Sequence, residues 1–222
     1  MGYYIEKSFE AAVAHRVYNQ YLNVDLRDNN LRPCPCKNIH GHTATFLVGL
    51  SSKELINDMV LDFNMIGFVK KALDMYYDHR FTICRDDPLS EYLVTKSYDI
   101  VKQEAIDAGL IKQSEANQYD IKLDVINELD GGDHYRCYRV FVPAVLRKTY
   151  NPLVELLDSF TITDFSTTSE NLAHWMYNVV VNRLNTVRKT TNDTVLKKIL
   201  KDVTVKRVSY KESPKSIAVY AE

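Results

Sequence analysis

Three histidines near the N-terminus have the spacing to share one metal ion. His40 and His42 are two residues apart, and on a β-strand such residues point to the same face of the sheet. An imidazole from a neighbouring strand, for which His15 is the candidate, would complete three nitrogen ligands with one position left open. That ligand set is typical of catalytic zinc, so the sequence predicts a zinc-dependent enzyme. The alternative is a group of hydrogen-bonded surface histidines.

A cysteine stands four residues before His40. Cys36 lies in a polar loop and ends the sequence Cys34-Pro35-Cys36. A bound cation and nearby imidazoles would favour its thiolate, which is the reactive form of the side chain. Cys36 is therefore the candidate catalytic thiol. Cys34 competes for this role, and Cys36 could instead pack as a small apolar residue.

Two further acidic groups could take part in the chemistry. Asp78 precedes His79 and could orient its ring and raise its basicity, although adjacent side chains need not point together. Glu212 is expected near the end of a strand, where it could accept two parallel hydrogen bonds from a flat heterocycle. Both carboxylates could equally be solvated.

Hydrophobic periodicity and capping signals place these residues on a small set of elements. Alternation and β-branched residues predict strands over residues 3–14, 40–50, 203–211 and 216–221. A helix with an apolar stripe is expected from Asp62 or Asn64 to about Tyr77. The pattern Thr167-x-x-Glu170 reads as a capping box that opens a second helix.

The segment 86–160 has the pattern of an insertion with its own elements. Asp87-Pro88 is a helix-start signal, and Ala108-Gly109 is a natural stop. Alternating apolar residues over 121–125 and 138–142 flank the turn at 130–133, which predicts a β-hairpin.

Without this insertion the order is strand, strand, helix, helix, strand, strand. The expectation is an α+β fold: an antiparallel four-stranded sheet with two helices on one face. Residues 1–222 would form one domain, with 86–160 inserted within it. The sheet would have two open edges, which neighbouring subunits could close.

Composition excludes several classes of protein. The chain has 222 residues, 45% of them hydrophobic, and a net charge of −1. There is no basic excess to hold a nucleic-acid backbone or an anionic membrane, and no apolar run approaches the roughly 20 residues that cross a bilayer. The N-terminal residues lack the pattern of a secretory signal, and the four cysteines do not suggest an oxidising compartment, so a cytoplasmic location is expected.

Seven short stretches occur in the order found in one enzyme family. The chain resembles the 6-pyruvoyltetrahydropterin synthase and 6-carboxytetrahydropterin synthase family. The matching stretches are Phe9 to Arg16, Cys36-x-x-x-His40-Gly41-His42, Leu61-Asp62-Phe63, Asp78-His79, Thr168 to Asn171, Lys211-Glu212 and Ala218-Val219-Tyr220.

The resemblance implies a fold, a cofactor and a role for each residue. The fold would be the tunnelling fold, whose subunits join their sheets into barrels, commonly as a homohexamer with the pocket between subunits. His15, His40 and His42 would bind zinc, which would bind the side-chain hydroxyls of the substrate, 7,8-dihydroneopterin triphosphate. The other roles implied are a thiolate base for Cys36, a second acid/base group for His79 oriented by Asp78, and pterin anchoring by Glu212 with Thr168 and Ser169 nearby.

The spacing of the cysteines bears on the product. Cys36-x-x-x-His40 resembles the queuosine-pathway enzyme that makes 6-carboxytetrahydropterin with release of acetaldehyde and triphosphate, and this is the favoured function. Cys34 has the spacing of the 6-pyruvoyl enzyme, which is the alternative, and a catalytically silent pterin-binding scaffold is a third possibility. The chain also departs from the family pattern, because Val13-Ala14 intervenes before His15 and Thr167 replaces a common proline.

Overall fold

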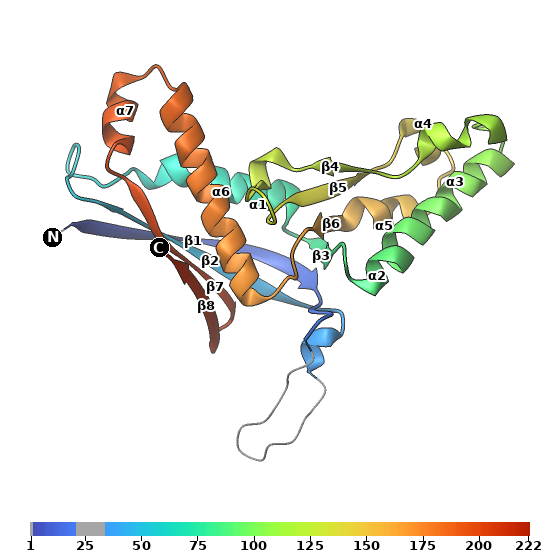
Figure 1. Cartoon of the computed structure of the whole chain (residues 1–222), viewed down its shortest axis with the longest axis horizontal. Helices are drawn as coiled ribbons and strands as arrows, with labels where there is room; N and C mark the ends of the chain where they lie inside the picture. Colours follow the sequence, from blue (N-terminus) through green and yellow to red (C-terminus); the bar gives the residue numbers. More distant parts are fainter. Residues whose placement is uncertain (1, 21–33) are drawn as a thin grey trace, which may run out of the picture.

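The strands form a single sheet that contains more strands than the sequence suggests (Figure 1). The computed structural model describes residues 2–20 and 34–222. It contains an eight-stranded sheet in the order β4-β5-β6-β3-β1-β2-β7-β8. The strands are β1 Tyr3–His15, β2 His40–Ser52, β3 Arg80–Cys84, β4 Lys122–Val125, β5 Cys137–Phe141, β6 Phe160–Thr163, β7 Thr204–Ser213 and β8 Ser216–Ala221.

The four antiparallel strands expected from the sequence form one half of this sheet. β1 pairs with β2, β2 with β7 and β7 with β8, all antiparallel. On β1 the side chains of Phe9, Ala11 and Val13 alternate with more exposed ones and are nearly inaccessible, as expected for a strand with one buried face. The register of β1 on β2 places His15 opposite His40 and Val13 opposite His42.

Helices cover the buried face of this half of the sheet. They are α1 Phe68–Tyr76 and α6 Ser169–Thr190, followed by the short α7 Thr194–Leu200. Residues of α1 and α6 share one hydrophobic core with β1, β2 and β7, and Trp175 of α6 is fully buried in it. The α+β arrangement predicted from the sequence, with two helices packed on one face of an antiparallel sheet, is therefore confirmed.

The starts of these helices differ in detail from the expectation. Asp62 caps a 3₁₀ turn, Phe63–Ile66, by accepting from the Asn64 N–H at 2.8 Å, and α1 begins only at Phe68. The N-cap of α6 is Thr168, whose hydroxyl accepts from the Asn171 N–H at 3.3 Å. The Thr167 capping box was therefore wrong by one residue, because the Thr167 hydroxyl is buried and donates to the Arg16 carbonyl instead.

The segment 86–160 adds helices and extends the sheet. Asp87 caps α2 Pro88–Ser90 as predicted, and the helix continues through a π-helical turn, Glu91–Lys96, into α3 Ser97–Asp107. The predicted hairpin is also confirmed, since β4 pairs antiparallel with β5. The segment also contains the helices α4 Ala144–Arg147 and α5 Leu153–Ser159 and the 3₁₀ turns Gln113–Tyr119 and Asn127–Leu129. Outside it, a further 3₁₀ turn, Pro35–Lys37, precedes β2.

Two strands, β3 and β6, were not expected from the sequence, and they join the four expected antiparallel strands to the hairpin in one larger sheet. β3 pairs parallel with the last residues of β1, and β6 pairs parallel with β3. All four residues of β6 and the last three of β3 are buried, so neither strand shows the alternation of a half-exposed strand. These strands pack with α3, α4 and α5 around a second hydrophobic cluster. The division into a domain and an insertion stays a prediction.

No helix in the described part of the chain combines the length and apolar character needed to cross a membrane.

Candidate metal centre and active site

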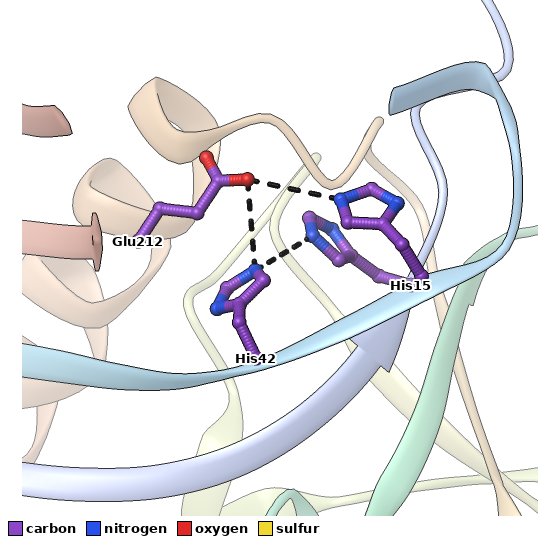
Figure 2. Close-up of side chains that lie close together, drawn as sticks. His15, His42 and Glu212 are labelled. Carbon is purple, nitrogen blue, oxygen red and sulfur yellow. Dashed lines mark hydrogen bonds and ion pairs between the residues drawn. The ribbon is translucent and has the colours of Figure 1, made fainter. Parts of the chain in front are cut away.

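The three histidines singled out by their spacing converge at the end of the buried face of the sheet. His15 is the last residue of β1, and His40 and His42 lie on the adjacent strand β2. The Nε2 atoms of His15 and His42 are 3.0 Å apart, and the ring centroids of His15 and His40 are 4.5 Å apart. Figure 2 shows the side chains of His15 and His42 pointing toward one another from the two strands. The cross-strand arrangement predicted from the sequence is thus present.

Glu212 completes the cluster. The sequence predicts it as an anchor for the pterin ring, and its place among the possible metal ligands was not expected. Its Oε1 lies 3.7 Å from Nε2 of both His40 and His42. The pairing of β7 with β8 shifts register between Lys211 and Ser213, so Glu212 occupies a bulge. Bulges commonly re-aim a side chain, and here the carboxylate faces the imidazoles (Figure 2). Its Oε2 accepts a hydrogen bond from the Ser169 hydroxyl at 2.8 Å.

Backbone carbonyls orient the rings of His15 and His40 and fix their tautomers. Nδ1 of His15 donates to the Thr167 carbonyl at 2.9 Å, and Nδ1 of His40 donates to the Asn38 carbonyl at 2.9 Å. A carbonyl only accepts, so each ring carries its proton on Nδ1 and turns the lone pair of Nε2 inward. Such outer contacts are usual for histidines that bind metals.

The donor set fits a divalent metal ion. The ligand atoms of His15, His40, His42 and Glu212 all lie within 4.8 Å of one another. Nε2 of His40 is buried without a hydrogen-bond partner, as expected of an atom that would bind an ion. Four ligands around tetrahedral zinc would be about 3.3 Å apart, and the distances of 3.0 and 3.7 Å lie on either side of that value.

Burial keeps the rings of His15 and His42 neutral at neutral pH. Burial, together with repulsion from His40 and His42, lowers the pKa of His15 from 6.5 to about 4. Burial also lowers the pKa of His42. For Glu212, burial opposes ionisation, but the Ser169 hydrogen bond and the three histidines outweigh it and lower the pKa. At neutral pH the cluster therefore offers the neutral imidazoles of His15 and His42 and the carboxylate of Glu212.

We predict that the metal-free protein loses stability as the pH falls below 6.5. The unfolded chain protonates His15 near pH 6.5, whereas the folded protein does so only near pH 4, so acid favours the unfolded state. As the pH falls from about 6.5 to about 4, protonation of His15 in the unfolded chain should lower the free energy of unfolding by about 3 kcal/mol in total. Urea denaturation of metal-free protein at pH 7, 6 and 5 measures this. His15→Asn should flatten the dependence, and an equally steep loss in that variant would contradict the assignment.

Cys36 lies beside the end of β1, and the surrounding protein groups favour its thiol form. Its carbonyl accepts from the Val17 N–H at 2.8 Å, which holds the loop against the residues that follow His15. Burial, a hydrogen bond with Cys34 and repulsion from Cys34 and Glu212 raise the pKa of Cys36 to about 11. The imidazoles alone therefore do not favour the thiolate, and the thiolate expected from the sequence would need the bound cation.

Asp78 and His79 form the expected pair but stand apart from the cluster. Nδ1 of His79 is 3.1 Å from Asp78 Oδ2, and the His79 side chain is 82% exposed. The Asp78 carboxylate accepts from the Ala12 N–H at 2.5 Å, and the His79 N–H donates to the Ala12 carbonyl at 2.7 Å. Ala12 precedes His15 by three residues, about 10 Å along a strand. Within one chain, His79 and the histidine cluster are thus separate.

The remaining site residues lie near the start of α6 or are engaged elsewhere. Ser169 contacts Glu212, whereas Thr168 is used as the N-cap. Two arginines have structural partners: Arg16 pairs with Asp87 at 3.0 Å, and Arg80 donates to the Asp158 carbonyl at 2.8 Å. Thr167, which the sequence analysis treated only as a helix cap, contacts His15.

Several known proteins are similar to this chain in sequence or in fold. The sequence model of the family described as 6-pyruvoyl tetrahydropterin synthase matches residues 4–222. The 6-carboxy-5,6,7,8-tetrahydropterin synthase of Aquifex aeolicus is 32% identical over 108 residues, which cover 46% of this chain and 67% of that protein. The crystal structure of the uncharacterized protein WS1659 from Wolinella succinogenes has a TM-score of 0.68 at 27% identity, covering 100% of this chain and 99% of that chain. The 6-pyruvoyl tetrahydropterin synthase of Plasmodium vivax has a TM-score of 0.49 at 12% identity, covering 100% and 98%.

Proposed function

Because the chain belongs to the 6-pyruvoyl tetrahydropterin synthase family, a family of lyases with the tunnelling fold, we propose that it is a zinc-dependent 6-carboxytetrahydropterin synthase. It would convert 7,8-dihydroneopterin triphosphate to 6-carboxy-5,6,7,8-tetrahydropterin, acetaldehyde and triphosphate, in queuosine biosynthesis. The observation that carries the proposal is the convergence of His15, His40, His42 and Glu212 in a chain of this family.

The histidines would bind the metal ion, and Glu212 would bind the ion or the pterin ring. His15, His40 and His42 would hold zinc through Nε2, which the carbonyl contacts of His15 and His40 support. The bound ion would polarise the hydroxyl groups of the substrate side chain and lower their pKa. Glu212 either binds the ion or accepts N–H groups of the pterin ring, and its hydrogen bond to Ser169 keeps the carboxylate ionised in both cases.

Proton transfer would use Cys36 and the Asp78–His79 pair. Cys36 is the proposed base for a side-chain proton, since it is held beside the strand that carries His15. His79, oriented by Asp78, is the proposed second acid/base group. Because His79 is exposed and lies apart from the cluster of its own chain, we propose that it serves the site of a neighbouring copy in a homohexamer.

The choice of the carboxy product rests on the spacing of Cys36 and on the name of the Aquifex relative. The 6-pyruvoyl product is the alternative, since Cys34 contacts Cys36 and has the spacing of that enzyme type. Mass spectrometry of the products from zinc-loaded protein and 7,8-dihydroneopterin triphosphate decides between them. Acetaldehyde with 6-carboxytetrahydropterin supports the proposal, and a 6-pyruvoyl product contradicts it. Tight pterin binding without turnover would identify the protein as a scaffold.

A further inference from the structure

Thr167 is fully buried between the end of β1 and the start of α6, and its carbonyl and hydroxyl both contact the metal-binding end of β1. Its carbonyl accepts from His15 Nδ1 at 2.9 Å, and its hydroxyl oxygen lies 3.3 Å from the same nitrogen. The hydroxyl also donates to the Arg16 carbonyl at 3.0 Å. One residue thus contacts both the ring of His15 and the backbone next to it.

These contacts determine where the proton of His15 sits. A threonine hydroxyl has one hydrogen, and the Arg16 carbonyl takes it. The hydroxyl therefore presents a lone pair to His15 Nδ1, as the Thr167 carbonyl does. With two acceptors facing Nδ1, the ring carries its proton there, and Nε2 is left with a free lone pair directed at the cluster.

We propose that Thr167 is a positioning residue for the metal centre, whose hydroxyl reinforces the tautomer of His15 set by its carbonyl and fixes the end of the strand that carries the ring. The inference rests on the proposed function in that it assigns His15 to a bound metal ion.

The segment 86–160 holds the same stretch of chain from the other side. Arg16 Nε lies 3.0 Å from Oδ2 of Asp87, whose side chain is fully buried. Oδ1 of Asp87 accepts from the Leu89 N–H at 2.9 Å, at the start of α2. Arg16 is therefore fixed through its carbonyl by Thr167 and through its guanidinium by Asp87, which connects the inserted helix to the residue after His15.

Three threonine variants separate positioning from general stability. Thr167→Val keeps the shape and the carbonyl but removes the hydroxyl, and Thr167→Ser keeps both polar groups. Thr161→Val is the matched control, because Thr161 is equally buried and its hydroxyl donates to the Tyr76 carbonyl. Zinc affinity is measured by competition with a chromogenic chelator. Loss of contacts around a ligand commonly weakens metal binding 10- to 100-fold, so we expect about a tenfold weaker zinc complex for Thr167→Val. Thr167→Ser and Thr161→Val should bind as the wild type does.

A second measurement uses the metal-free protein. Nitrogen-15 NMR of the histidine side chains should show His15 protonated on Nδ1 in the wild type and in Thr167→Ser. In Thr167→Val only the carbonyl still faces Nδ1, so a larger fraction of His15 than in the wild type should be protonated on Nε2. Wild-type zinc affinity and an unchanged tautomer in Thr167→Val would overturn the inference. If the wild type binds no zinc, the proposed metal centre is wrong, and the nitrogen spectra still decide whether Thr167 fixes the ring.

Discussion

His42→Ala should lose the metal ion and the activity together. His42 supplies one of three imidazoles, and its Nε2 is 3.0 Å from that of His15 and 3.7 Å from the Glu212 carboxylate. Without it the remaining donors cannot close around one ion. The loss should exceed that for an outer contact, so we expect zinc binding to weaken more than about 100-fold and turnover to disappear. Chelator competition and a turnover assay measure the two effects.

The chain offers a matched control for this change. His174 lies on α6 and stacks on Tyr220 with ring centroids 3.8 Å apart, outside the cluster. His174→Ala should therefore retain zinc and turnover, although it removes a half-buried imidazole as well. One zinc ion bound with wild-type affinity by His42→Ala would contradict the assignment of the ligands.

Cys36→Ala should slow turnover by orders of magnitude and leave the metal ion in place. The thiol is the proposed proton acceptor but is not part of the cluster of ligand atoms. General base catalysis contributes about 10²- to 10⁴-fold, so the expected loss in kcat is about a thousandfold with unchanged zinc content. Steady-state kinetics together with metal analysis of the same samples separate this result from that of His42→Ala.

Cys34→Ala is the natural comparison, since both thiols lie in one short turn and contact each other. It should keep kcat within a few-fold of the wild type. The reverse outcome, with an active Cys36→Ala and an inactive Cys34→Ala, would move the catalytic role to Cys34 and remove the argument for the carboxy product.

The histidine site could be predicted from the sequence because it depends on local geometry. The alternation of side chains on a strand places His40 and His42 on one face, and β1 and β2 are neighbours both in the chain and in the sheet. His15 then needs only the antiparallel register to reach them. Glu212 could not be placed in this way, because its position depends on the pairing of β7 with β2 and on a bulge between β7 and β8.

The strands β3 and β6, which extend the sheet, could not be predicted from the sequence for a different reason. β3 and β6 are short and buried, so their sequences give neither alternation nor the length of a helix. Their parallel pairing joins segments far apart in the chain, which no local pattern reports. The role of Thr167 was missed because a Thr three residues before a Glu is the usual signature of a helix cap, whereas its hydroxyl is taken by the Arg16 carbonyl.

Anomalous diffraction from crystals of zinc-loaded protein at the zinc absorption edge tests the central claim most directly. The account predicts a single strong peak within about 2.0–2.1 Å of Nε2 of His15, His40 and His42. The absence of a peak among these rings, or a zinc ion held by other residues, would contradict it.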